Sequence, residues 1–139
     1  MRQARERIEL DGRGRGFTDL TATLAKWVGA SGIRVGMLTV FVPHTSASLV
    51  IQENADPDVR SDLEVFFAKL VPDGDPAYRH TSEGGDDMPS HIRSALTQTQ
   101  VNVPVEAGKL TLGTWQSVYF WEHRTRPRKR HLLLHLLRK

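Results

Sequence analysis

Hydrophobic and polar side chains alternate along much of this chain, with the period of two that is typical of half-buried β-strands. The segments that alternate, or that form a β-branched or apolar run, are residues 5–10, 33–42, 48–51, 101–105, 118–123 and 132–137. A short turn separates residues 101–105 from Leu110 and Leu112, which predicts a hairpin. The glycine-rich residues 12–16 predict a flexible turn.

Helical spacing appears in the segments between these strands. Thr18 is placed to cap a first helix, in which Leu20, Leu24, Trp27 and Val28 recur at helical spacing until residues 29–32 stop it. A second helix is predicted with Asp56 as N-cap and Pro57 as its first residue. Its apolar stripe would consist of Val59, Leu63, Phe66, Phe67 and Leu70.

A third helix is predicted to begin near Met88 and Pro89, where Asp86 and Asp87 suit the positive end of the helix dipole. Its apolar side would consist of Ile92, Ala95 and Leu96. The long polar connection before it, residues 71–87, is unusual inside a small domain, and such loops are often functional. The order of elements predicts an α+β fold with a mainly antiparallel sheet or two packed sheets.

The composition narrows the class of protein. The 139 residues include 39% hydrophobic and 25% charged side chains, as in ordinary globular proteins, so one domain over residues 1–139 is expected. No apolar run is long enough to span a membrane, and the first residues lack the apolar core of a secretory signal. A cytoplasmic protein with no membrane partner is expected. The absence of cysteine excludes disulfides and thiolate chemistry, so any metal must bind His, Asp, Glu or Asn.

Three histidines are candidate metal ligands. His44 follows a proline at the end of a predicted strand, His80 lies in the long connection, and His91 lies in the first turn of the third helix. Three imidazoles with a carboxylate suit zinc, manganese or iron and leave a coordination position open. Glu53 and Asn54 are candidate partners. The alternative interpretation is that each histidine is an ordinary hydrogen-bonded side chain, because the spacing does not place two ligands on one helical face.

Glu122 ends the apolar face of a predicted strand, after Val118 and Phe120. Burying an unpaired carboxylate is costly, so Glu122 must reach water or meet a cation or proton donor, which makes it a candidate acid, base or ligand partner. Arg93 is a candidate phosphate ligand, with an ordinary surface arginine as the alternative. The basic residues after Arg124 are interpreted as a solvated connection, with nucleic-acid binding as the alternative.

Several blocks of the sequence resemble the YjbQ family of secondary thiamine-phosphate synthases. The blocks are HTSASLVIQENADPDVRSDLEVF, DPAYRH, DDMPSHIRSAL and GKLTLGTWQSVYFWEHR. The resemblance implies a compact α+β fold with a β-sandwich and two or three helices, and a homotrimer. It implies a polar site of His44, Glu53 or Asn54, His80, His91 and Glu122, and a weak ability to join a pyrimidine pyrophosphate to a thiazole phosphate with loss of pyrophosphate.

The working hypothesis is an enzyme for a small anionic, phosphorylated substrate. His44, His80 and His91 would bind a divalent metal, with zinc, manganese or magnesium as candidates, and Glu122 or Glu53 would orient ligands or move a proton. Substrate contacts would come from Asn54, Arg93, Trp115 and Gln116. The alternative is a trimer without enzymatic activity that binds a metabolite or nucleic acid through the basic tail. Salt sensitivity would mark the nucleic-acid binder, and sensitivity to a chelator would mark the enzyme.

Overall fold

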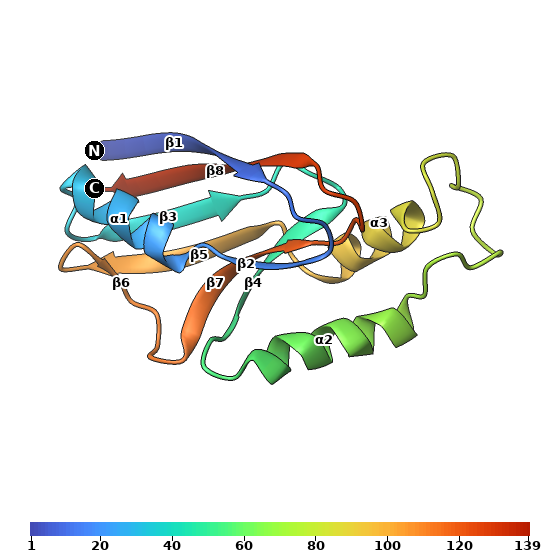
Figure 1. Cartoon of the computed structure of the whole chain (residues 1–139). Coiled ribbons are helices and arrows are strands. Elements are labelled where there is room, and N and C mark those ends of the chain that lie inside the picture. Colours follow the sequence, from blue (N-terminus) through green and yellow to red (C-terminus); the bar gives the residue numbers. More distant parts are fainter.

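Eight strands form two antiparallel sheets in the computed structural model, which describes all 139 residues (Figure 1). The large sheet has the order β1-β8-β3-β5-β6, and the small sheet has the order β2-β7-β4. The large sheet consists of β1 (Arg2–Asp11), β8 (Lys129–Arg138), β3 (Gly36–Phe41), β5 (Gln100–Glu106) and β6 (Lys109–Leu110). The small sheet consists of β2 (Gly16–Asp19), β7 (Gln116–Glu122) and β4 (Ala47–Glu53). The predicted α+β class with antiparallel strands is confirmed.

The basic C-terminal segment is a central strand of the large sheet. β8 pairs with β1 from Arg2↔Arg138 to Asp11↔Lys129, and with β3 on its other edge. Leu132, Leu134 and Leu136 are buried, as the alternation predicts. The interpretation of the basic residues after Arg124 as a solvated connection holds for Arg126 and Lys129, which are exposed, and is wrong for Arg130, which is buried.

The first helix, α1 (Thr21–Ser31), buries Leu24 and Val28 and ends at Gly32, whose φ is +74°. Thr18 does not cap it. Thr18 lies in the strand β2 (Gly16–Asp19), which was not predicted, and the backbone N–H of Thr21 donates to Asp19 Oδ1 at 2.9 Å. The alternation over residues 16–19 is too short to separate a strand from a turn, which explains the missed element.

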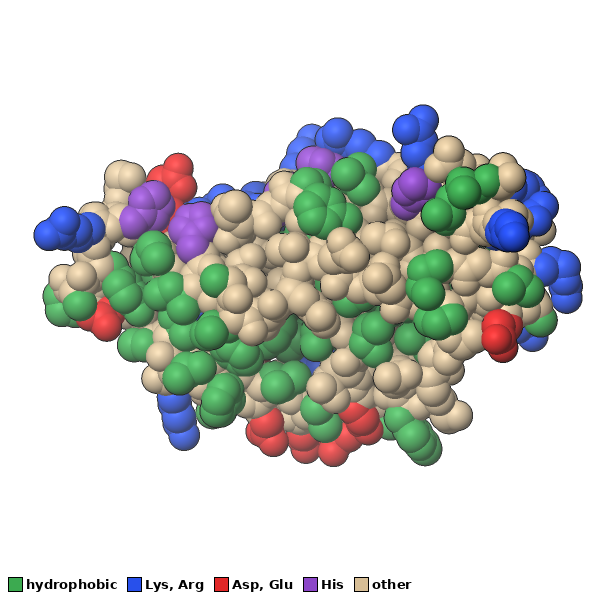
Figure 2. Space-filling view, turned by 180° about the vertical axis from the view of Figure 1, so that it is seen from behind, with side chains coloured by type: hydrophobic (Ala, Val, Ile, Leu, Met, Phe, Trp, Pro, Cys, Tyr) green, Lys and Arg blue, Asp and Glu red, His purple; other side chains and the backbone are tan.

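The second helix, α2 (Pro57–Leu70), begins as predicted, with Asp56 Oδ1 accepting from the Asp58 N–H at 2.9 Å. No residue of α2 is buried, however, although its apolar stripe predicts a buried face. Phe67 contacts Trp121 of β7 edge to face, whereas Phe66 and Leu70 are more than half exposed. Figure 2 shows hydrophobic side chains gathered on the lower left of one face, above a cluster of acidic side chains at the lower edge, and α2 lies in the lower part of the molecule (Figure 1).

The third helix, α3 (Asp87–Leu96), buries a polar face. Asp87, Ser90, Arg93 and Ser94 are buried, while Leu96 of the predicted apolar side is 56% exposed. The Ser90 hydroxyl donates to the carbonyl of His123, and the Ser94 hydroxyl donates to the carbonyl of Ala47. These hydrogen bonds attach α3 to the ends of β4 and β7, so polar pairing replaces apolar packing beside the candidate site.

The hydrophobic core lies between the two sheets and beneath α1. One cluster of 17 buried residues includes side chains of α1, β3, β4, β5, β7 and β8. The long connection after α2 and the helix α3 lie at one end of the sheets, whereas both chain termini lie at the other end (Figure 1). None of the three helices is long and apolar enough to cross a membrane.

Candidate functional site

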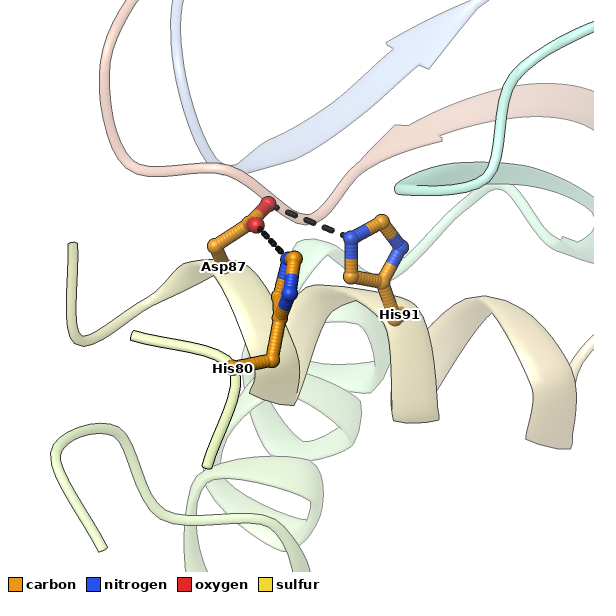
Figure 3. Close-up of side chains that lie close together, drawn as sticks. All are labelled: His80, Asp87 and His91. Carbon is orange, nitrogen blue, oxygen red and sulfur yellow. Dashed lines mark hydrogen bonds and ion pairs between the residues drawn. The ribbon is translucent and has the colours of Figure 1, made fainter. Parts of the chain in front are cut away.

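Two histidines and an aspartate meet at the start of α3 (Figure 3). His80 Nε2 lies 2.6 Å from Asp87 Oδ2, and His91 Nε2 lies 3.4 Å from Asp87 Oδ1. Their candidate ligand atoms all lie within 4.8 Å of one another. Asp87 and His91 are one helical turn apart on α3, and His80 comes from the connection between α2 and α3. This group is called the trio below.

The hydrogen bonds around His91 direct a lone pair into the trio. His91 Nδ1 lies 2.9 Å from the carbonyl oxygen of Thr45, which can only accept, so Nδ1 carries the proton. In the neutral ring, Nε2 is then an acceptor that faces Asp87 Oδ1, which is buried and accepts no hydrogen bond. Arg124 Nη1 lies 2.8 Å from that oxygen, but its N–H bonds do not point at it. Two facing acceptors require a proton or a cation between them.

Asp87 is ionised in the folded protein. Burial alone would raise its pKa, but the hydrogen bond from His80 and the charge of Arg124 outweigh burial and hold the pKa below its usual value. Two imidazoles and one carboxylate are therefore available as ligands. This donor set suits zinc or manganese better than magnesium, which prefers oxygen ligands.

A cavity of about 890 Å³ opens beside the trio. It lies between the end of β3, the Pro43–Ser46 turn and α3, and both His91 and His44 line it. Arg130 of β8 lines it as well. This volume falls in the range of small-molecule sites. It is called the histidine cavity below.

His44 lies in the histidine cavity but outside the trio. Its Nε2 accepts a hydrogen bond from the backbone N–H of His131 at 3.1 Å, and the two rings meet edge to face. Burial lowers the pKa of His44, and the charges of Arg130 and His131 lower it further. His44 is thus a neutral imidazole whose remaining nitrogen, Nδ1, carries the proton.

Glu122 is 2% exposed and forms a bidentate ion pair with Arg130. The two charged hydrogen bonds measure 2.7 Å each, and the backbone N–H groups of His123 and Arg124 also donate to Oε2. The prediction that Glu122 meets a cation holds, and the cation is an arginine from a segment interpreted as solvated. A carboxylate with four donors is not free to accept a proton from a substrate.

Four predicted site residues lie at the opposite end of the small sheet. Ala47 pairs with Glu122, whereas Glu53 pairs with Gln116 at the other end of the same ladder. Six residues of extended strand separate these ends by about 20 Å. The side chain of Asn54 donates to the carbonyls of Thr114 and Gln116. Glu53, Asn54, Trp115 and Gln116 therefore do not share a site with the trio in one protomer.

Two further polar groups are buried beneath α3. Arg93 is 1% exposed and donates to Glu64 of α2 at 3.3 Å, so it is not exposed to a substrate as predicted. His123 is fully buried with its Nε2 2.8 Å from the Ser48 hydroxyl. Burial, together with the charges of Arg93 and Arg15, lowers the pKa of His123 to about 3. These residues hold α2, α3 and β7 together.

Asp87 as a candidate ligand, and Arg124 and Arg130 as buried partners of carboxylates, were not predicted from the sequence. The position of Asp87 was attributed to the helix dipole alone, and its spacing from His91 was not considered. Asp87 and His91 are separated by four positions, which places both on one face of a helix. The spacing Asp-x-x-x-His is thus the carboxylate equivalent of a helical His-x-x-x-His pair, whereas the one such pair in the sequence, His131 and His135, lies on the strand β8.

The fold and the trio together define a class: a small antiparallel α+β protein with a histidine and carboxylate group beside a polar cavity. The family model described as UPF0047 protein YjbQ-like matches residues 6–139. A UPF0047 protein of Synechocystis sp. is 51% identical over 135 residues, which cover 97% of this chain and 92% of the relative. The UPF0047 protein YjbQ of Salmonella typhimurium is 46% identical over 88% of this chain and 90% of its own length.

Among solved structures, an uncharacterized conserved protein of the YjbQ/UPF0047 family from Clostridium acetobutylicum superposes with a TM-score of 0.87. It is 38% identical, and the match covers 95% of this chain and 99% of that protein. The chain belongs to the YjbQ/UPF0047 family.

Proposed function

We propose that this protein is a metal-assisted enzyme for a small phosphorylated substrate, with the trio of His80, Asp87 and His91 as the metal ligands. The observation that supports it is the pair of facing acceptors, His91 Nε2 and Asp87 Oδ1, 3.4 Å apart beside the histidine cavity. A divalent cation held there would draw negative charge from the phosphate oxygens of a ligand. Asp87 Oδ1 is buried beside the charge of Arg124, at 2.8 Å, but accepts no hydrogen bond, so it is available as a ligand to a cation.

The proposed reaction is a weak transfer of the thiamine-phosphate-synthase type. A pyrimidine pyrophosphate and a thiazole phosphate are joined as a C–N bond replaces the C–O bond to the leaving pyrophosphate. The resemblance to the family supports this choice, and both substrates are anionic, as a cation and a neighbouring arginine require. The physiological substrate belongs to the same chemical class, a small phosphorylated molecule.

The chain's own residues would act by positioning and by hydrogen bonding. His44 keeps its Nδ1 proton because His131 occupies Nε2, so it would donate to an oxygen of a ligand in the histidine cavity. Arg130 lines the same cavity, and Glu122 holds its guanidinium in place. Glu122 would thus act as a positioning residue, and proton transfer by Glu122 is not part of the proposal.

A homotrimer is part of the proposal. The exposed apolar side chains of α2, with Phe66 at 57% and Leu70 at 55%, support self-association, and the resemblance supports the number three. If Glu53 and Trp115 act on the same substrate as the trio, another copy must supply them, since about 20 Å of strand separates the two groups within one protomer. Light scattering should give the mass of three chains, and the mass of one chain would refute the trimer.

The metal site is tested by elemental analysis of protein purified without chelators. His80→Ala and His91→Ala should each lower the content of zinc or manganese from about one ion per chain to near zero. His135→Ala is the matched control, because His135 is an exposed histidine that contacts Gln3 on β1. The control should keep its metal. A wild type that contains no metal, and that binds none when zinc, manganese and magnesium are added, would show the metal site to be wrong.

His44→Ala decides between two ligand sets. The sequence analysis predicts three histidine ligands, and a loss of metal in this variant would support that set. The geometry of the trio favours retained metal and reduced turnover instead, since His44 lines the cavity and its Nε2 is occupied by His131. Turnover of a pyrimidine pyrophosphate with a thiazole phosphate is the assay, and a chelator should abolish it.

A further inference from the structure

A second cavity, of about 610 Å³, adjoins the trio on the other side of Arg124. One wall is the Glu83–Asp86 turn, and the other is the connection from β7 to β8. None of its eight lining residues is hydrophobic. Arg124 separates it from the trio, because Nη1 lies 2.8 Å from Asp87 Oδ1 while Nε donates to Asp86, which lines the cavity. It is called the arginine cavity below.

The charges that line the arginine cavity do not cancel. Asp86 accepts hydrogen bonds from Arg124 and from the backbone of Thr125, so its charge is matched. Glu83 makes one long contact with Arg124, at 3.8 Å, and is 66% exposed. Arg126 and Arg128 line the cavity, and neither takes part in any of the ion pairs of the protein. The lining residues thus comprise three arginines and two carboxylates, a surplus of one positive charge.

Arg128 is also held in position with an unsatisfied donor. Its Nε is shielded from solvent and has no hydrogen-bond partner. Its backbone is fixed by the Gly12 N–H, which donates to the Arg128 carbonyl at 2.9 Å. Gly12 approaches so closely that a Cβ there would lie 2.3 Å from that oxygen. The backbone of Arg128 is therefore fixed at the edge of the cavity, and its guanidinium, which pairs with no acidic side chain, is available to an anion.

We propose that the arginine cavity binds a phosphate group, as a phosphate ester or a pyrophosphate, through Arg126 and Arg128. The cavity has room for a phosphate group, and none of its lining residues is apolar or aromatic. The phosphorylated end of a small molecule therefore fits it better than a base or a hydrophobic ring does. That the rest of the same ligand lies on the far side of Arg124, beside the trio, depends on the proposed function. Phosphate binding itself does not require the metal.

Calorimetric titration of metal-free protein with orthophosphate and pyrophosphate tests the site. Arg128→Gln should weaken binding about tenfold or more, because it removes a charge-assisted donor from the cavity. Lys129→Gln is the matched control: it removes one positive charge from the next position, which is exposed and does not line the cavity. The control should bind within about twofold of the wild type. Phosphate should raise the melting temperature of the wild type and the control but not that of Arg128→Gln.

Three results would overturn the proposal: no phosphate or pyrophosphate binding by the wild type, full affinity in Arg128→Gln, or an equal loss in Lys129→Gln. If Arg128→Gln does not fold, Arg126→Gln gives the same comparison from an exposed position. Metal content is measured in the same samples and should not change in either arginine variant. A failure of the metal site would therefore leave phosphate binding intact, and a failure of the arginine cavity would leave metal content intact.

Discussion

Glu122 and Asp87 are two buried carboxylates with opposite surroundings. Each is at most 2% exposed, and each lies within 2.8 Å of an arginine. Glu122 has four donors distributed over its two oxygens, whereas Oδ1 of Asp87 accepts no hydrogen bond. Burial alone therefore does not separate a structural carboxylate from a candidate ligand. The number of donors that the fold supplies does.

The arginines explain the difference. Arg130 donates two hydrogen bonds to Glu122 and one to the Ser46 hydroxyl. Glu122 is thus the one carboxylate that pairs with this guanidinium. Arg124 is shared among three acidic side chains, Glu83, Asp86 and Asp87. Arg124 Nε donates to Asp86. Asp87 Oδ1 lies close to the Arg124 guanidinium but accepts no hydrogen bond from it. A shared arginine thus leaves one oxygen available for a cation.

The largest effect is expected from Glu122→Gln. It should lower the free energy of unfolding by about 3–5 kcal/mol, because it leaves Arg130 as a buried, unpaired charge. Urea unfolding measures the change. The double variant Glu122→Gln, Arg130→Met removes both charges and should recover part of the loss. A cost no larger than that of an exposed ion pair would show that Glu122 is not a structural carboxylate.

Acidification should produce the next largest effect. His123 has a pKa of about 3 in the folded protein against 6.5 for a free histidine, because burial and the charges of Arg93 and Arg15 disfavour its charged form. Between these values the unfolded chain binds a proton that the folded chain does not. Stability should therefore fall as the pH falls through this window, by up to about 1.4 kcal/mol per pH unit.

His123→Gln isolates that contribution, since glutamine is polar and does not titrate. Unfolding in urea is measured from pH 7 down to pH values just above the ordinary Asp range near 3.8, where carboxylates begin to contribute. The variant should show a flatter pH dependence than the wild type. An unchanged slope would mean that His123 is protonated in the folded state.

Asp87→Asn should separate binding from stability. Asparagine keeps the shape and an acceptor, and Arg124 keeps Asp86, so the free energy of unfolding should fall by only about 1 kcal/mol. Metal content should fall to near zero, because the anionic ligand of the trio is lost. If Asp87→Asn destabilises the fold as strongly as Glu122→Gln while metal content stays the same, Asp87 is a second structural carboxylate and the comparison fails.

The smallest effect is expected at the exposed pair of Arg7 and Glu9. Their N–O distance of 2.8 Å nearly equals the 2.7 Å of the Glu122–Arg130 pair, but both side chains are more than half exposed. Glu9→Gln should change the free energy of unfolding by less than about 1 kcal/mol, since solvent screens the pair. This variant is the matched control for Glu122→Gln, and an equal cost in both would remove burial as the cause.

Most of the fold could be predicted because its apolar pattern is regular. The leucines of β8 alternate, and Asp56 and Pro57 mark the start of α2 without ambiguity. The polar buried face of α3 could not be predicted, because its serines are buried by hydrogen bonds to other elements rather than by hydrophobicity. The exposure of Phe66 on α2 was not predicted for a related reason. An apolar stripe predicts burial but does not identify the surface that covers it.

The candidate site was predicted in part. His80 and His91 come together as predicted, but Asp87 joins them in place of the predicted ligand His44, and Glu53, the predicted carboxylate partner, lies elsewhere. Glu53 was grouped with His44 because the two are near in sequence. When a strand lies between two residues, its full length separates them in space, even though they are close in sequence. The donors around Glu122 come from Arg130 in another strand, and only the register of the sheets reveals them.

The position of β8 affects how the chain acquires its fold during synthesis. β8 is the last strand to be translated, yet it lies between β1 and β3 and pairs Arg138 with Arg2. Until β8 has left the ribosome, both β1 and β3 have an unpaired edge where β8 belongs, and such edges invite pairing with other chains. Closure of the sheet joins the two ends of the chain, a contact that makes folding slow. The nascent protein therefore exposes both edges to other chains until the ten residues of β8 emerge.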